Sequence, residues 1–100
     1  MIGIIGATGD IGSECTKILN NYGLQSLKLG YREKEKIYKS KNVFEFIDLD
    51  DISTCIEFVD GCDCIINCSE YSDSSIFNLI DIVNKNKCIL IDLSYYNFYE

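Results

Sequence analysis

Three glycines near the start of the chain have the spacing of a phosphate-binding turn. Gly6, Gly9 and Gly12 follow the apolar run Ile2–Ile5 and precede a helical pattern. In such a turn the first glycine permits a tight exit from the strand, and the second removes a Cβ that would block a ligand. The third allows the helix to pack closely on the sheet. The N–H groups of the first helical turn then favour an anion. We predict a diphosphate site; the alternative is a β–α turn that binds no ligand.

The residues between these glycines complete the predicted diphosphate site. Thr8 could donate its hydroxyl to a phosphate or a ribose, and Ile11 opens the helical pattern. Asp10 stands where the anion should approach and would repel it, so we expect its side chain to face solvent or to cap the helix. Thr8, Asp10 and Ile11 therefore join the three glycines as candidate cofactor-binding residues.

A second group of candidates follows the second predicted strand, where the adenosine ribose of a dinucleotide would lie. NAD-binding domains place an acidic residue here, about 20 residues past the glycines. In this chain Tyr31 and Arg32 follow the strand Leu24–Leu29 at that point. The Arg32 guanidinium could hold a 2′-phosphate, with charge added by Lys34 or Lys36. Either Tyr31 or Arg32 could stack on adenine.

These residues favour NADP as the cofactor. Glu33 keeps NAD open as the alternative, and Arg32 could also be a solvated loop residue. Asp48 and Leu49, just past the third predicted strand, could border the adenine ring. Residues 48–51 can cap the next helix; the alternative for Asp48 and Leu49 is therefore a helix N-cap at Asp48 or Asp50, and one residue could do both.

Groups that could transfer a proton are hard to identify. The chain has no histidine, and none of its tyrosines has a lysine four positions on, the pairing that short-chain dehydrogenases use. Tyr71, in the loop after the fourth predicted strand, could reach the nicotinamide, although a surface aromatic is the simpler interpretation. A nucleophilic role for Cys68 lacks a base nearby in sequence. Catalytic residues stay unassigned.

These candidates need a sheet that brings strand ends together, and apolar runs alternate with helical patterns along the whole chain. The predicted strands are Ile2–Ile5, Leu24–Leu29, Val43–Ile47, Cys62–Cys68 and Cys88–Leu93. The predicted helices are Ile11–Tyr22 ended by Gly23, Glu33–Tyr38, Ile52–Val59 ended by Gly61, and a last one from Ile76 to near Asn86. This alternation predicts a three-layer α/β, Rossmann-like domain over residues 1–100, with a parallel sheet in the order 3-2-1-4-5. The glycine turn and the loop 67–73 then meet at the switch point between the first and fourth strands.

Apolar residues at helical spacing predict which faces of the helices pack on the sheet. The predicted faces are Ile11, Cys15, Ile18, Leu19 and Tyr22 in the first long helix, Ile52, Cys55, Ile56 and Val59 in the second, and Ile76, Phe77, Ile80 and Val83 in the third.

Composition excludes several classes of protein. The net charge of −7 makes nucleic acid an unlikely partner, and no apolar run approaches the ~18 residues of a membrane span. The N-terminus lacks the basic flank of a signal peptide, so we predict a cytoplasmic location. The six cysteines fit buried thiols in a reducing compartment, and without a CxxC pair or histidine a metal site is not expected. Cys62, Cys64 and Cys68 share one parity of a predicted strand and should project to the same side.

The motifs together resemble the NADP-binding domain of saccharopine dehydrogenase-like reductases, over nearly the whole chain. The similar segments are the turn from Gly6 to Gly12, Gly30-Tyr31-Arg32, Cys64-Ile65-Ile66-Asn67-Cys68 and Ile91-Asp92-Leu93-Ser94. The spacing GxxGxxG is also similar to that of extended and atypical short-chain dehydrogenases, but the segments around Asn67-Cys68 and Asp92-Leu93-Ser94 favour the saccharopine dehydrogenase-like family over the extended short-chain group.

The resemblance implies an oxidoreductase that acts on a C=N, C–N or C=O bond of a small, amino-acid-like substrate. It also implies that Asn67, Cys68 and Ser69 lie along the nicotinamide ribose; an ordinary strand end is the alternative. Family members continue into a substrate domain, whereas this sequence stops soon after the fifth predicted strand. The aromatic segment Tyr95–Tyr99 could contact such a domain or a second copy in a homo-oligomer, or could fold back on its own sheet. A sensor that binds NAD(P) without catalysis and a Rossmann-like interaction module remain alternative functions.

Overall fold

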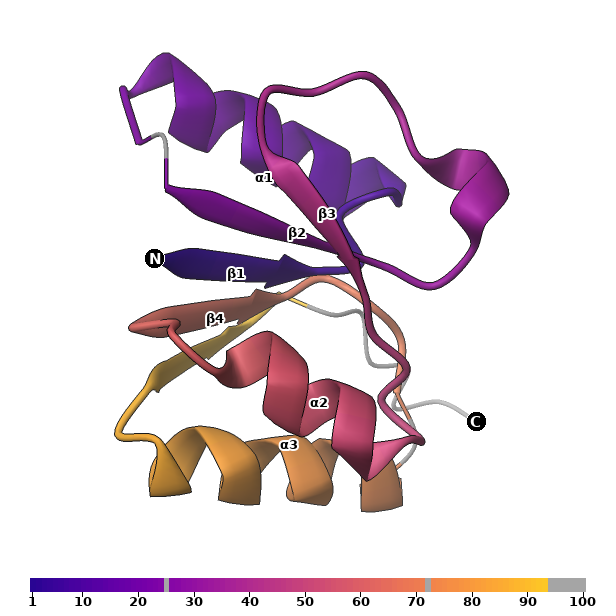
Figure 1. Ribbon diagram of the computed structural model, residues 1–100, viewed down its shortest axis with the longest axis vertical. Helices are drawn as coiled ribbons and strands as arrows, with labels where there is room; N and C mark the ends of the chain where they lie inside the picture. Colours follow the sequence, from indigo (N-terminus) through magenta and orange to yellow (C-terminus); the bar gives the residue numbers. More distant parts are fainter. Residues whose placement is uncertain (25, 72, 94–100) are drawn as a thin grey trace.

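Five short parallel strands form one sheet in the order β3-β2-β1-β4-β5, as predicted (Figure 1). The computed structural model describes residues 1–24, 26–71 and 73–93. The strands are β1 (Ile2–Ile5), β2 (Leu27–Tyr31), β3 (Val43–Phe46), β4 (Cys64–Asn67) and β5 (Ile89–Asp92). The helices are α1 (Asp10–Asn21), α2 (Ile52–Val59) and α3 (Asp73–Lys85), with one 3₁₀ turn, η1 (Lys34–Lys36). The aromatic segment 95–99 lies outside the described residues.

The sheet has a helix layer on each face, so its central strand is buried on both sides. Figure 1 shows α1 on one face, and α2 and α3 together on the other. Successive residues of β1 point to opposite faces of the sheet, each of which has its own hydrophobic cluster. Ile4 belongs to the cluster beneath α1, and Ile5 belongs to the cluster beneath α2 and α3. Such two-sided burial explains why β1 is a continuous apolar run. The chain leaves β1 through α1 on one face and reaches β4 through α2 on the other face, so a ligand site is expected at the carboxyl ends of β1 and β4.

The helix ends follow the predicted glycine signals. Gly23 has φ +82°, and the N–H groups of Gly23 and Leu24 donate to the carbonyls of Asn20 and Leu19, as in a Schellman motif. Gly61, at φ +81°, follows the end of α2 in a different turn, in which the N–H of Cys62 donates to the carbonyl of Val59. Because Leu24 belongs to the cap of α1, β2 begins at Leu27 and not at the predicted residue.

The predicted helix over residues 33–38 is wrong. Only Lys34–Lys36 form a single 3₁₀ turn, and the rest of the β2–β3 connection is irregular. At the end of this segment the Tyr38 hydroxyl donates to the glycine turn and the Tyr38 ring packs against Phe44 of β3, contacts that the irregular connection makes possible. Parts of β2 and β3 therefore lack a covering helix on that side.

The predicted apolar faces are each only partly correct. In α1 the buried residues are Gly12 and Thr16, whereas Ile18 is 51% exposed. In α2 the face on the sheet is Cys55, Phe58 and Val59, and Ile56 is 52% exposed. These helices carry more apolar residues than one face can hold, so the 3.6-residue period alone does not identify the buried side.

In the third helix, too, the buried face differs from the predicted one. Leu79, Ile82 and Val83 are buried in α3, and the predicted core residue Phe77 is 68% exposed. Only Val83 of these was predicted to face the sheet, and Ile76 packs against the core while remaining partly buried.

The six cysteines are free thiols, of which Cys55 and Cys62 are buried. The predicted common side of Cys62 and Cys68 is wrong, because Cys62 packs beneath α2 and α3 and Cys68 packs on the α1 side. Cys62 lies before the start of β4 at Cys64, so the alternation of the strand does not extend to it, whereas Cys68 lies on the side that the alternation predicts. Over the described part of the chain, no cluster of side chains could hold a metal ion, and no helix is long and apolar enough to cross a membrane.

Candidate functional site

A cavity of about 330 Å³ opens at the carboxyl ends of the strands, beside the glycine turn. Seven predicted site residues line it: Gly6, Thr8, Tyr31, Arg32, Asp48, Leu49 and Ser69. Six other predicted site residues do not line it: Gly9, Asp10, Ile11, Gly12, Asn67 and Cys68. The structure therefore gathers parts of the turn, the end of β2, the end of β3 and the loop after β4 around one space.

Two glycines of the turn are required by the fold itself. Gly6 has φ +76°, and a Cβ there would stand 2.9 Å from the backbone nitrogen of Ser69. A Cβ at Gly12 would overlap the carbonyl oxygen of Gly6. The first glycine thus lets the turn pass under the β4–α3 loop, and the third lets α1 approach the turn.

Gly9 differs, because the protein around it does not need the missing side chain. A Cβ at Gly9 would meet only the carbonyl oxygen of Gly6, at an ordinary 3.5 Å, and its φ of −81° suits any residue. Gly9 is the N-cap of α1, and its carbonyl accepts the N–H of Ser13. The turn therefore presents bare backbone at a helix N-terminus, a cradle that a Cβ would fill. This observation fits a bound diphosphate.

Asp10 and Ile11, the other candidates at the start of α1, point away from this cradle. Asp10 is exposed, in agreement with the expectation that it faces solvent. Ile11 is 48% exposed and, with Asp10, Ile18 and Leu93, lines a separate, almost wholly apolar groove of about 430 Å³. Side-chain contact of Ile11 with a cofactor in the first cavity is therefore not favoured by this geometry.

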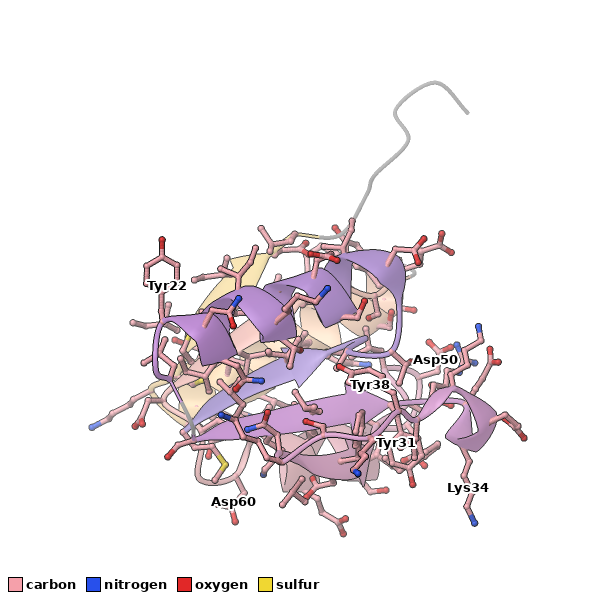
Figure 2. The ribbon with its side chains drawn as sticks, turned by 90° about the horizontal axis from the view of Figure 1, so that it is seen from above. Tyr22, Tyr31, Lys34, Tyr38, Asp50 and Asp60 are labelled. Atoms are coloured by element: carbon pink, nitrogen blue, oxygen red, sulfur yellow. The ribbon has the colours of Figure 1, made fainter. Side chains whose placement is uncertain are left out.

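The end of β2 supplies one cation and one ring to the cavity. Arg32 is exposed and is the only basic residue among those that line it. The Tyr31 ring packs edge-on against Phe44 and Phe46, with centroids 6.3 and 5.9 Å away. The Lys36 ammonium lies 3.4 Å from Glu33, whereas Lys34 projects outward from η1 (Figure 2).

The end of β3 contributes Asp48 and Leu49, which do not act as the helix cap. The N-cap of α2 is Asp51, whose carboxylate accepts the N–H of Ser53. Asp48 is held through both its backbone and its side chain, since its N–H donates to the Thr54 hydroxyl and its Oδ1 accepts the N–H of Asp50. The cap thus lies within residues 48–51, the segment predicted to provide it, but neither Asp48 nor Asp50 is the cap.

Asn67 is fully buried and holds the end of β4 together. Its amide nitrogen donates to Asp92 Oδ1 at 3.3 Å, and its oxygen accepts the N–H and the hydroxyl of Ser69, at 3.2 and 2.8 Å. Of these groups, only Ser69 reaches the cavity. The geometry makes Asn67 a support for the Ser69 loop.

Cys68 directly follows β4 and packs on the α1 side of the sheet, near the Cys15 thiol. Burial, together with the neighbouring Cys15 thiol, raises the pKa of Cys68 to about 12. A neutral thiol is a weak nucleophile, which agrees with the absence of a base for this residue in the sequence.

Several lining residues were not among the predicted site residues: Ile5, Ile47, Asp50, Glu70, Tyr71 and Ser75. Asp50 and Glu70 directly follow predicted site residues, so a wider window around each strand end would have included them. Tyr71 was considered only for proton transfer. Ser75, in the first half of α3, is buried and had no sequence signal of its own.

Comparisons with known proteins identify the family. No curated protein sequence matches the chain. A short-chain dehydrogenase/reductase from Veillonella parvula, in complex with NADP, is similar with a TM-score of 0.75 and 17% identity, over 91% of this chain and 45% of that one. A uronate dehydrogenase variant from Agrobacterium tumefaciens, complexed with NAD, has a TM-score of 0.74 and 18% identity, over 91% and 39%. A nucleoside-diphosphate-sugar epimerase from Staphylococcus aureus has a TM-score of 0.76 and 21% identity, over 91% and 36%.

These solved structures share the fold, and the chain spans less than half the length of each. The comparisons support a Rossmann domain of the kind that binds NAD(P), but not the resemblance to saccharopine dehydrogenase-like reductases. That resemblance relied partly on the Asn67-Cys68 pair at the end of β4, where the buried Asn67 side chain bonds to Ser69 and Asp92. The family model that matches, over residues 2–87, is described as the NAD dependent epimerase/dehydratase family. This chain belongs to the NAD dependent epimerase/dehydratase family.

Proposed function

We propose that this chain binds NADP across the carboxyl ends of β1, β2 and β4 as the cofactor-binding part of an oxidoreductase. The observation that carries the proposal is Gly9, whose missing side chain leaves an open space that the fold does not require. A diphosphate there would accept hydrogen bonds from the N–H groups of the first turn of α1 and would lie at the positive end of the helix dipole. Thr8, which lines the cavity, supplies a hydroxyl to the same region.

The rest of the cofactor would extend from this turn in two directions. The adenosine would lie toward the ends of β2 and β3, with Arg32 at the ribose and Asp48 and Leu49 beside the adenine. The nicotinamide ribose would lie toward Ser69, which Asn67 holds in place. The cofactor supplies hydride transfer, and these residues bind and orient it.

Charge near the ribose favours NADP over NAD. Residues 32–41 contain five of the nine basic residues of an otherwise acidic chain. Arg32 is the member of this group that lines the cavity. A guanidinium can donate two parallel hydrogen bonds to two oxygens of a phosphate. Carboxylates of Asp48, Asp50 and Glu70 also line the cavity, which keeps NAD as the second candidate.

Replacing Arg32 with alanine tests this assignment by titration of NADPH and NADH fluorescence. One lost charge-assisted contact corresponds to roughly 10- to 100-fold weaker NADPH binding, and NADH binding should change by less than about twofold. Lys17→Ala, which removes an exposed charge from α1, is the matched control. Equal losses for both cofactors would refute the 2′-phosphate role of Arg32. A wild-type chain that binds neither at millimolar concentration would remove the cofactor proposal itself.

For the substrate we propose a small carbohydrate-like alcohol or ketone. Support comes from the family and from two structural relatives, one a uronate dehydrogenase and the other a nucleoside-diphosphate-sugar epimerase. The amino-acid-like substrate expected from the sequence has no support in these comparisons. More than half of each relative lies outside the matched part, and we propose that substrate contacts come from polypeptide beyond this unit. The cytoplasmic location stays a prediction.

A further inference from the structure

We propose that Tyr38 is a positioning residue that orients the glycine turn for the diphosphate; this inference rests on the proposed function. Tyr38 belongs to the irregular connection between β2 and β3, far along the chain from the turn. Its hydroxyl nevertheless donates a hydrogen bond of 3.1 Å to the carbonyl oxygen of Ala7, in the middle of that turn. Figure 2 shows Tyr38 reaching from the connection toward the start of α1.

This bond determines the orientation of one peptide group. The N–H of Ala7 donates to the carbonyl of Gly30 at 3.0 Å, so both backbone polar groups of Ala7 are held by β2 and its connection. In a trans peptide the C=O and the following N–H point in opposite directions. The Tyr38 bond therefore fixes the N–H of Thr8 on the side of the peptide opposite the Tyr38 hydroxyl, and Thr8 is among the residues that line the cavity. A bare N–H held in one orientation at a cavity is a donor for a phosphate oxygen.

The Tyr38 hydroxyl is itself held in a defined place. Its ring packs edge-on against Phe44, with centroids 5.1 Å apart and an interplanar angle of 88°. The ring also lies against the cluster formed by Ile4, Ala7 and Leu29, and Ala7 is fully buried. Tyr38 is not among the residues that line the cavity, so its effect on a cofactor would pass through the Ala7–Thr8 peptide. This separates Tyr38 from Arg32, which belongs to the same connection and reaches the cavity directly.

The test is the variant Tyr38→Phe, which keeps the ring and removes only the hydroxyl. NADPH and NADH share the diphosphate, so both should bind about five- to tenfold more weakly, and by the same factor. The melting temperature should stay within a few degrees of the wild type. Tyr22→Phe, at a highly exposed position at the end of α1, is the matched control.

The pattern of loss separates this role from a purely structural one. If Tyr38 only stabilised the β2–β3 connection, the variant would lose more affinity for NADPH than for NADH, because that connection carries Arg32. Such a selective loss overturns the inference, and so does unchanged binding of both cofactors. If the wild-type chain binds neither cofactor, the proposed function fails. If the wild type binds both and Tyr38→Phe binds them equally well, only the inference about Tyr38 fails.

Discussion

Replacing Gly9 with alanine should separate the stability of the fold from the affinity for the cofactor. The added Cβ meets one protein atom, the Gly6 carbonyl oxygen at 3.5 Å, and the backbone conformation of Gly9 is open to any residue. Alanine restricts the unfolded chain more than glycine does, and it is a poorer N-cap. These two effects oppose each other, so the free energy of unfolding should change by less than about 1 kcal/mol.

The cofactor should respond much more strongly than the fold. The new methyl group occupies the space in which a phosphate oxygen would approach the first turn of α1. Loss of one charge-assisted hydrogen bond from that turn corresponds to about 1.5–3 kcal/mol, or roughly 10- to 150-fold in Kd. Isothermal titration with NADPH, beside urea unfolding of the same samples, measures both quantities.

Two further glycine variants serve as controls for this experiment. Gly12→Ala should destabilise the protein severely, because its Cβ overlaps the Gly6 carbonyl oxygen. Gly23→Ala has open space but a φ of +82°, so it should lower stability by about 1 kcal/mol and leave cofactor affinity unchanged. If Gly9→Ala binds NADPH as tightly as the wild type, the cradle at Gly9 does not hold the diphosphate.

Two other predictions concern stability. Asn67→Leu should lower the free energy of unfolding by about 1–3 kcal/mol in urea titrations, because it removes the buried hydrogen bonds of Asn67 to Asp92 and Ser69; a change within error would show that Asn67 does not support the loop. Burial raises the pKa of the thiols, in Cys68 from 9.0 to about 12. The unfolded chain therefore loses these protons first, and stability should be fully present below about pH 9 and fall as the pH rises toward 12. Urea midpoints measured from about pH 8 upward should show this fall, and Cys68→Ala should make it shallower; equal slopes for the two proteins would contradict the assignment to Cys68.

The features of the fold that depend on backbone chemistry were accessible from the sequence. Gly6 and Gly12 are required by close contacts of main chain with main chain, and Gly23 by a positive φ. Such constraints act locally, so they appear as glycines at fixed spacing. The strand order followed from the βαβ alternation and the handedness of crossovers, which do not depend on details of side-chain packing.

Features that depend on contacts between distant segments were not accessible. The Tyr38 hydroxyl reaches Ala7 only after the β2–β3 connection has folded over the turn, and a helical pattern was predicted in its place. Asn67 is a polar residue at a strand end, and its sequence position does not distinguish a ligand contact from the buried bonds to Ser69 and Asp92 that the structure shows. Knowledge of which side of each helix meets the sheet likewise requires the packed structure.

The central claim is that a nicotinamide dinucleotide binds at the N-terminus of α1, and amide chemical shifts test it most directly. In a ¹H–¹⁵N spectrum of the whole chain titrated with NADP⁺, the largest shifts should fall on the amides of Thr8, Gly9 and the first turn of α1, with smaller ones at Arg32 and Ser69. Saturable shifts confined to another surface, such as the lysine-rich groove between α1 and residues 38–41, would contradict the claim. The absence of any shift at millimolar NADP⁺ and NAD⁺ would contradict it as well.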